Sequence, residues 1–200
     1  CKSTSDQIYL CPTGPLTNIA LSLQKDPSIK NKIKEIVFMG GAAMCLGNTT
    51  PSAEFNIYVD PHAANIVLDS DIPLTMMGLD VTHQVNVNRI VINSMNENNN
   101  KSSKFFGELM EFYTIFHKKL YETEETPLHD PCVIAYLLEP GIFKGKLVNV
   151  IVEENSKLTR GETIVDWLGV TNRKPNCMVM NHADDKKFFE LLKNKLSNLP

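Results

Sequence analysis

Three short, largely apolar runs alternate with helical stretches in the first 80 residues, and this alternation constrains the fold more than any other feature. The runs cover residues 7–11, 34–39 and 73–78. Apolar runs of this length are typical of strands buried on both faces of a sheet. Strand, helix, strand, helix, strand in this order predicts an α/β fold. We expect a Rossmann-like, mostly parallel, doubly wound sheet flanked by helices, with right-handed connections.

The helices between these runs have identifiable start signals. The first follows a Thr-Gly-Pro turn, has apolar residues at helical spacing over 16–23, and can take Thr13 or Thr17 as its N-cap. The second begins at Asp60-Pro61, with the aspartate as N-cap and the proline in the first turn. Its predicted buried stripe consists of Ala63, Ala64, Val67 and Leu68.

The rest of the chain continues with helices and strands, and no linker divides it, so residues 1–200 are expected to form a single domain. Residues 86–100 end in an Asn-rich run and predict a solvated linker. Residues 105–120 are strongly amphipathic, and their apolar stripe predicts a core-facing helix or a subunit interface. The other predicted elements are a helix at 131–138, a late antiparallel strand pair at 146–153 and 163–167, a strand at 176–181 and a helix at 183–196.

Composition and charge exclude several classes of partner. Apolar residues make up 42% of the chain, charged residues 22%, and the net charge is −3. This balance gives no attraction for nucleic acid or an anionic membrane, and no apolar run approaches the roughly 18 residues of a spanning helix. The five cysteines lack CxxC spacing, which favours free thiols and a cytoplasmic location. A first-position cysteine also fits a mature lipoprotein, although residues 7–11 already form a core strand.

A long polar loop follows the second predicted strand. Residues 40–52 are rich in Gly, Asn, Thr and Pro, and connections of this length are usually functional or disordered. The glycines here do not have the GxGxxG spacing of a dinucleotide-binding turn. Neither GxSxG nor HExxH occurs in the chain. The sequence therefore excludes the common dinucleotide, serine-hydrolase and zinc-protease motifs.

Glu54 and Asn56 form the first candidate binding pair. If this segment is extended, residues two apart project to the same face, with Phe55 opposite. A carboxylate accepts hydrogen bonds and an amide both donates and accepts, which suits the hydroxyl groups of a sugar. The alternative interpretation is a surface strand or loop without a ligand.

His129 and Asp130 form the second candidate pair, directly before Pro131 at a predicted helix N-terminus. The helix dipole there favours an anionic Asp130 and lowers the pKa of His129. The alternative is that Asp130 is a plain N-cap and His129 an ordinary loop residue. Asp80 and His83 also follow a strand end, and we interpret them as scaffold.

Six short segments carry these residues or flank them. They are Thr-Gly-Pro-x-Thr-Asn from Thr13, Met-Gly-Gly from Met39, Gly-Asn from Gly47, Ala-Glu-Phe-Asn from Ala53, Gly-Leu-Asp-Val-Thr from Gly78, and Leu-His-Asp-Pro from Leu128. Together they resemble the inosine/uridine-preferring nucleoside hydrolase family. The resemblance runs from about residue 7 to the C-terminus. A late segment with Arg160 and Asp166 also resembles the family, and we interpret these two as a structural charge pair.

The resemblance implies hydrolysis of the N-glycosidic bond of purine or pyrimidine ribonucleosides to ribose and free base, as in nucleoside salvage. In the family, the Glu and Asn of the Ala-Glu-Phe-Asn segment and the Asn of the preceding Gly-Asn hold the ribose. The Met that ends the preceding strand lines the sugar pocket. Carried over to this sequence, the substrate-binding residues are Met39, Asn48, Glu54 and Asn56.

The resemblance also implies Ca²⁺ as the cofactor. Asp130 is expected to be a direct ligand and the backbone carbonyl of Thr13 another, while His129 is expected to donate a proton to the leaving base. The family's opening strand carries a DxDxxxDD metal motif, which these 200 residues lack. The resemblance therefore predicts an incomplete domain without the family's first strands, whose missing N-terminal piece would be needed for full activity.

The partners implied by the resemblance are a ribonucleoside substrate and further copies of the chain in a homo-oligomer. Two other interpretations stay open. One is a non-catalytic nucleoside- or ribose-binding or assembly module derived from the family, because holding a ribose does not require catalysis. The other is a general Rossmann-like domain with an unrelated function, which explains the layout but not the matching segments.

Overall fold

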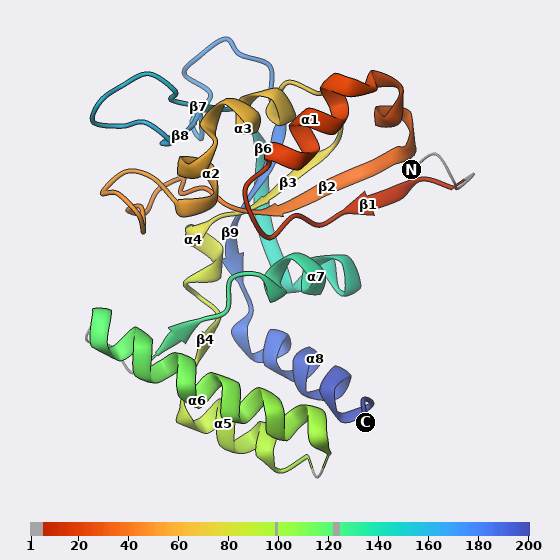
Figure 1. The fold of residues 1–200 in the computed structure, drawn as a ribbon, viewed down its shortest axis with the longest axis vertical. Coiled ribbons are helices and arrows are strands. Elements are labelled where there is room, and N and C mark those ends of the chain that lie inside the picture. Colours follow the sequence, from red (N-terminus) through yellow and green to blue (C-terminus); the bar gives the residue numbers. More distant parts are fainter. Residues whose placement is uncertain (1–5, 99, 122–124) are drawn as a thin grey trace.

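A computed structural model of the chain describes residues 6–98, 100–121 and 125–200, and Figure 1 shows its fold. The strands are β1 (Ile8–Leu10), β2 (Ile33–Met39), β3 (Leu74–Met77), β4 (Asn86–Val87), β5 (Thr126–Pro127), β6 (Phe143–Val148), β7 (Val150–Val152), β8 (Thr163–Val165) and β9 (Cys177–Ala183). The α-helices are α1 (Thr17–Lys25), α2 (Phe55–Val59), α3 (Pro61–Leu68), α4 (Leu79–Thr82), α5 (Arg89–Asn96), α6 (Lys101–Tyr121), α7 (Pro131–Leu138) and α8 (Asp185–Ser197), and the 3₁₀ helices are η1 (Pro27–Lys32) and η2 (Pro140–Ile142).

The main sheet has five strands in the order β1-β2-β3-β9-β6. The first four strands of this order run parallel, and β6 is antiparallel to β9. The predicted mostly parallel α/β sheet is therefore confirmed. The predicted late antiparallel pair exists as β7 and β8, which form a separate two-stranded sheet, whereas β6 joins the main sheet.

Strand β2 is buried on both faces, which explains its apolar sequence. Ile36 and Phe38 belong to a core shared with α1 and α3, while Val37 and Met39 belong to a core shared with α7 and α8. Figure 1 shows α1 and α3 on one side of the sheet and α7 on the other, with α5, α6 and α8 gathered beyond α7.

The N-cap of α3 is the predicted residue, Asp60, but the N-cap of α1 is not one of the predicted threonines. Asp60 accepts a hydrogen bond from the backbone N–H of Ala63 at 3.0 Å, and Pro61 occupies the first turn. In α1 the N-cap is Leu16, without a side-chain cap. The Thr17 hydroxyl instead donates to Asp60 at 2.6 Å. The predicted threonine cap is wrong because this hydroxyl ties α1 to the N-terminus of α3.

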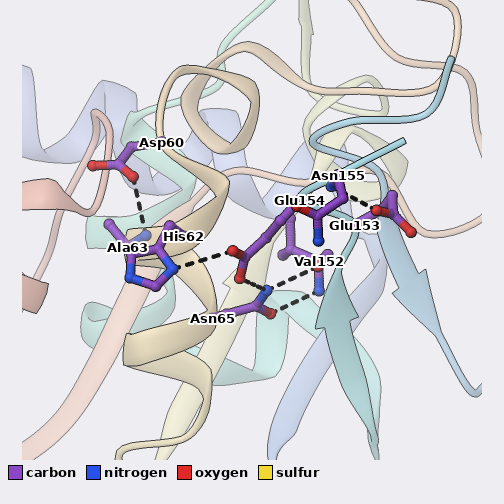
Figure 2. A network of polar contacts seen from close by, with 8 residues as sticks. All are labelled: Asp60, His62, Ala63, Asn65, Val152, Glu153, Glu154 and Asn155. Carbon is purple, nitrogen blue, oxygen red and sulfur yellow. Dashed lines mark hydrogen bonds and ion pairs between the residues drawn. The ribbon is translucent and has the colours of Figure 1, made fainter. Parts of the chain in front are cut away.

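Asn65 on α3 anchors the small β7–β8 sheet. Its side-chain amide donates to the carbonyl of Val152 and its side-chain oxygen accepts from the N–H of Val152, both at 2.8 Å (Figure 2). Glu154 accepts from the same amide at 2.6 Å and lies 3.1 Å from His62. Asn65 thus pairs with both backbone groups of Val152, as a neighbouring strand would.

The linker predicted at residues 86–100 is wrong. Most of this stretch forms β4 and α5, and Asn88 caps the helix by accepting from the N–H of Val91 at 3.1 Å. An asparagine that could mark a loop marks a helix start here, because its side chain satisfies a backbone donor of the first turn.

Helix α6 exists as predicted, but only part of its apolar stripe packs against the core of the described chain. Phe105, Leu109 and Phe112 are 66%, 47% and 73% exposed, so they do not face the core of the described chain. Met110 is buried in the core on this helix, and Tyr113 packs against that core. Helices α5 and α8 pack against α6, and their positions determine which face of α6 is shielded from solvent.

Arg160 and Asp166 do not pair with each other as predicted. Arg160 donates to the carbonyl of Tyr58 at 2.7 Å. Asp166 accepts from the backbone N–H groups of Val170 and Thr171, both at 2.8 Å. Arg160 ties its loop to α2, whereas Asp166 holds the turn that follows it.

The cysteines of the described chain are free thiols, as predicted. Cys11, Cys45, Cys132 and Cys177 are free, and Cys1 lies outside the described residues. In the part of the chain that the structure covers, no helix combines the length and apolar character needed to cross a bilayer.

Candidate functional site

A pocket of about 570 Å³ lies where polar residues follow the carboxyl ends of the main strands. The residue set lining it includes all seven predicted site residues, namely Thr13, Met39, Asn48, Glu54, Asn56, His129 and Asp130. They come from the turn after β1, the end of β2, the following loop, α2, and the segment before α7. A larger hollow of about 840 Å³ is lined by other residues and contains none of the seven.

Glu54 does not lie in an extended pair with Asn56 as predicted. It is the N-cap of α2, and its carboxylate accepts from the N–H groups of Asn56 at 2.9 Å and Ile57 at 3.2 Å. It also accepts from the N–H of Gly41 at 3.0 Å. The side chain is 2% exposed, and burial raises the pKa of Glu54 although these hydrogen bonds act to lower it.

Gly41 must adopt a conformation that other residues avoid. Its φ is +85°, and a Cβ here would lie 2.8 Å from the sulfur of Met76. The next residue, Ala42, donates to and accepts from the hydroxyl of Thr163 in β8 at 2.9 and 2.5 Å. The chain leaving β2 is therefore fixed before it reaches the pocket.

Asn56 contacts two of the other predicted residues, Met39 and Thr13. Its side-chain amide donates to the carbonyl of Met39 at 3.1 Å and to the carbonyl of Thr13 at 3.5 Å, and lies 3.4 Å from the sulfur of Met39. The residue is 8% exposed. Its side-chain oxygen has no hydrogen-bond partner within the described residues, which leaves an acceptor for a ligand.

The loop that carries Asn48 is held at several points. Asp80, interpreted as scaffold, accepts from the N–H groups of Ala43 at 2.6 Å and Met44 at 2.8 Å. Asn48 accepts from the N–H of Phe55 at 2.9 Å through its side-chain oxygen. No described residue accepts from the amide nitrogen of the Asn48 side chain, so this group can donate to a ligand in the pocket.

His129 is packed against α4. Its Nδ1 lies 2.8 Å from the hydroxyl of Thr82, and its ring meets that of His83 edge-on with centroids 5.5 Å apart. Burial, followed by the neighbouring His83 and His117, lowers the pKa of His129 to about 4. The predicted direction is correct, but burial is the main cause. His129 is therefore uncharged near pH 7.

Asp130 is not the plain N-cap of the alternative interpretation. Its side chain accepts no capping hydrogen bond from α7 and makes none elsewhere in the described chain. Burial raises the pKa of this carboxyl. Asp130 is close enough to Glu54 for its charge to raise the pKa of Glu54 further.

The donors suit calcium in kind but not in number. A carboxylate without a hydrogen-bond partner and a main-chain carbonyl are the hard oxygen ligands that Ca²⁺ prefers. However, within residues 6–98, 100–121 and 125–200 no group of three or more His, Cys, Asp and Glu side chains could hold a metal. Asp130 and the Thr13 carbonyl are oxygen donors at the same pocket, and together they are fewer than the six to eight oxygens that calcium takes.

Sequence reasoning missed several residues that line the pocket. Asn86, Tyr113, His117 and Glu125 all contribute to its wall. His83, which we interpreted as scaffold from the sequence, also lines the pocket. Tyr113 and His117 are four residues apart on α6, with ring centroids 6.3 Å apart. In the sequence, the only indication of their role is that Tyr113 and His117 place polar groups on a largely apolar helix. This pattern does not show which cavity the two side chains line.

Comparisons with known proteins agree with the geometry. The family model for inosine-uridine preferring nucleoside hydrolases matches residues 1–190. The pyrimidine-specific ribonucleoside hydrolase RihA of Salmonella paratyphi B is 44% identical over 196 residues, which cover 98% of this chain and 63% of RihA. An uncharacterized protein of Schizosaccharomyces pombe is 44% identical over 193 residues, covering 96% of this chain and 62% of its own length. The chain thus spans less than two thirds of these relatives.

Solved structures show the same fold. A purine-preferring ribonucleoside hydrolase from Gardnerella vaginalis superposes with a TM-score of 0.85 at 34% identity, covering 94% of this chain and 60% of that one. An inosine-uridine preferring nucleoside hydrolase from Bacillus anthracis superposes with a TM-score of 0.82 at 25% identity, covering 98% and 62%. The chain belongs to the inosine-uridine preferring nucleoside hydrolase family.

Proposed function

We propose that the protein hydrolyses the N-glycosidic bond of purine or pyrimidine ribonucleosides, giving ribose and free base. The observation that carries this proposal is that all seven residues matched to the family's segments line one pocket. RihA is named pyrimidine-specific and the Gardnerella protein purine-preferring, so the relatives cover both classes of base.

The polar groups of the pocket suit a ribose. Asn48 offers an amide donor, Asn56 a side-chain oxygen, and Glu54 a carboxylate whose position is fixed by three backbone N–H groups. A sugar hydroxyl both donates and accepts, so it can pair with each of these groups. Because the Glu54 side chain is already held in place without substrate, it loses little conformational entropy when a substrate binds.

The same groups favour departure of the base. As the glycosidic bond breaks, the sugar becomes positively charged, and the carboxylates of Glu54 and Asp130 favour this charge in a partly buried pocket. His129 is uncharged near pH 7 and lies at the same pocket, where a ring N–H can donate to the leaving base.

We propose Ca²⁺ as the cofactor, held here by Asp130 and the carbonyl of Thr13. A bound calcium ion would supply positive charge that orients ribose hydroxyls and makes a water more acidic. Calcium takes about six to eight oxygen ligands, and these two residues provide only part of that number. We therefore expect the 200-residue chain alone to release ribose much more slowly than the full natural gene product.

A second candidate function is nucleoside binding without hydrolysis. The shortage of metal ligands among the described residues favours it, because Asn48, Glu54 and Asn56 do not depend on a metal to contact a sugar. Calorimetry with nucleosides, with and without calcium, tests this function. Binding by the full natural gene product without any release of ribose supports it.

Ribose release from inosine and from uridine tests the main proposal, measured on the full natural gene product with calcium in excess. Asn48→Ala is expected to lower kcat/KM by at least about tenfold, since a hydrogen bond to the sugar is lost. Asn172→Ala, an exposed asparagine outside the pocket, is the matched control and should stay within about twofold. Absence of ribose release from both nucleosides contradicts the proposal.

We also propose that the protein is a cytoplasmic homo-oligomer. The exposed apolar residues Phe105, Phe112 and Ile115 on α6 support self-association, and the four free cysteines of the described chain support a reducing compartment. Sedimentation velocity and cell fractionation test the two properties. A monomer at all concentrations, or recovery outside the cytoplasm, contradicts them.

A further inference from the structure

The side chain of His129 has a single hydrogen-bond partner in the described chain, the hydroxyl of Thr82. Thr82 is the last residue of α4, directly after β3, and is fully buried. Its Oγ1 lies 2.8 Å from Nδ1 of His129, and the other ring nitrogen, Nε2, has no partner among the described residues. Nε2 is therefore the nitrogen available to a ligand.

The direction of the hydrogen bond between Thr82 and His129 determines which nitrogen of the neutral His129 ring carries the proton. Within the residues that the structure describes, His129 Nδ1 is the only partner of this hydroxyl. If the hydroxyl only accepted from an Nδ1–H group, its own proton would be buried without an acceptor, which costs free energy. The favoured arrangement has Thr82 donating to Nδ1. The ring proton of neutral His129 is then on Nε2.

The backbone fixes the rest of the residue. The N–H of Leu128 donates to the carbonyl of Val85 at 2.9 Å, and the carbonyl of His129 accepts from the N–H of Cys132 at 3.2 Å. His83 lies edge-on to the ring. These contacts fix the backbone around His129 and cover one side of its ring. Among the described residues, only Thr82 lies within hydrogen-bonding distance of a ring nitrogen.

We infer that Thr82 is a positioning residue that holds His129 as the Nε2–H tautomer, so that this N–H donates a hydrogen bond to the departing nucleobase. The inference rests on the proposed function and deepens it, because it assigns the donor atom and the residue that orients it. Without the Thr82 hydroxyl, Nδ1 and Nε2 can each carry the proton, and the donor is present only part of the time.

Three variants of the full natural gene product test the inference. Thr82→Val keeps the shape and removes the hydroxyl, while Thr82→Ser restores it. Thr75→Val is the matched control, because Thr75 is equally buried in β3 and its hydroxyl donates to Glu35 at 2.6 Å, outside the proposed site.

Turnover is compared on nucleosides and on 4-nitrophenyl β-D-ribofuranoside, whose leaving group is stable as an anion. Thr82→Val should lower kcat on nucleosides by about tenfold or more, with KM and 4-nitrophenyl riboside turnover within about twofold. Thr82→Ser and Thr75→Val should stay within about threefold on both substrates. An equal fall on both substrates for Thr82→Val, or no fall on nucleosides, overturns the inference.

The ¹⁵N shifts of the His129 ring give a readout independent of turnover. The wild-type protein and Thr82→Ser should show the Nε2–H tautomer, and Thr82→Val a mixture of both tautomers. An Nδ1–H ring in the wild-type protein, or an unchanged ring in Thr82→Val, overturns the inference. A wild-type protein that releases no ribose contradicts the proposed function, while the ring shifts still decide whether Thr82 sets the tautomer.

Discussion

At the scale of single residues, Glu54 is the side chain on which both the fold and the proposed chemistry depend. Its carboxylate closes the N-terminus of α2 and holds Gly41 at the end of β2. The same carboxylate lines the pocket. A group fixed by three backbone donors cannot reorient, so it is preorganised for a sugar hydroxyl.

Replacing this carboxylate by an amide should affect stability directly. In Glu54→Gln one oxygen becomes an NH₂ group that faces a backbone N–H, so we expect a loss of about 1–3 kcal/mol in the free energy of unfolding. Urea denaturation measures it. Glu190→Gln, at an exposed position of α8, is the control and should change stability by less than about 0.5 kcal/mol. Equal stabilities for the two variants would contradict the capping role.

His129 should make the protein sensitive to acid. Its pKa in the folded state is about 4, below the ordinary value of 6.5, so the unfolded chain binds the proton more tightly. This contribution to stability is complete above pH 6.5 and is lost as the pH falls toward 4. The free energy of unfolding is expected to fall when the pH is lowered from about 7 to about 4.5. This fall should be about 2 kcal/mol smaller in His129→Gln than in the wild type.

Unfolding by urea at the two pH values tests this difference. Glu54 and Asp130 have raised pKa values and take up protons in the folded state, which acts in the opposite direction, but they are present in both proteins. His182→Gln, at an exposed histidine, is the control and should follow the wild type. Identical pH dependence of His129→Gln and wild type would contradict the assignment.

The sequence predicted which residues meet at the pocket but not how they are held. Residues 54 and 56 share a face in a strand, yet the same spacing also fits an N-cap and the second residue of a helix. The choice depends on the N–H of Gly41, which only the folded chain brings to Glu54. The role of Thr82 was equally hidden, because 47 residues separate it from His129.

At the scale of elements, local pattern predicted the buried strands well and the orientation of surface helices poorly. Strand β2 is apolar because both of its faces are buried, a property contained in its own sequence. Which face of α6 is buried depends instead on α5 and α8. Of the two predicted roles of the apolar stripe, the core role does not hold for Phe105 and Phe112, and the subunit interface stays a prediction. Residues 89–96 form α5 because Asn88 caps it, which composition alone does not reveal.

The attachment of the β7–β8 sheet to α3 gives a prediction at this scale. Asn65→Ala removes the partners of both backbone groups of Val152, so we expect a loss of about 1–3 kcal/mol in the free energy of unfolding. His62→Ala removes an exposed contact with Glu154 in the same network (Figure 2), and its effect should be below about 0.5 kcal/mol. Thermal unfolding of both variants measures the difference, and a larger loss for His62→Ala would refute the prediction.

At the scale of the whole molecule, the chain spans 62% of the Schizosaccharomyces pombe protein and 63% of RihA, and its described residues include no group of three or more His, Cys, Asp and Glu side chains that could hold a metal. The family and fold followed from the motif segments and the strand pattern. The number of metal ligands could not be predicted in the same way, because metal ligands come from several segments that only folding brings together.

Calcium binding should depend on Asp130. In the full natural gene product, Asp130→Asn should raise the calcium Kd at least about tenfold, since a charged oxygen ligand is lost. Asp71→Asn is the matched control, because Asp71 is exposed, has a φ of 59° that asparagine tolerates, and lies outside the pocket. Isothermal titration calorimetry measures both, and a Kd within about twofold of wild type for Asp130→Asn would contradict the assignment.

The central claim is that this pocket binds the ribose of a nucleoside. The most direct test is a crystal structure of the full natural gene product with ribose and calcium. We predict the sugar within hydrogen-bonding distance of Asn48, Glu54 and Asn56, with Asp130 on the calcium ion. A sugar bound elsewhere, or bound in the pocket without contacting these residues, would contradict the account.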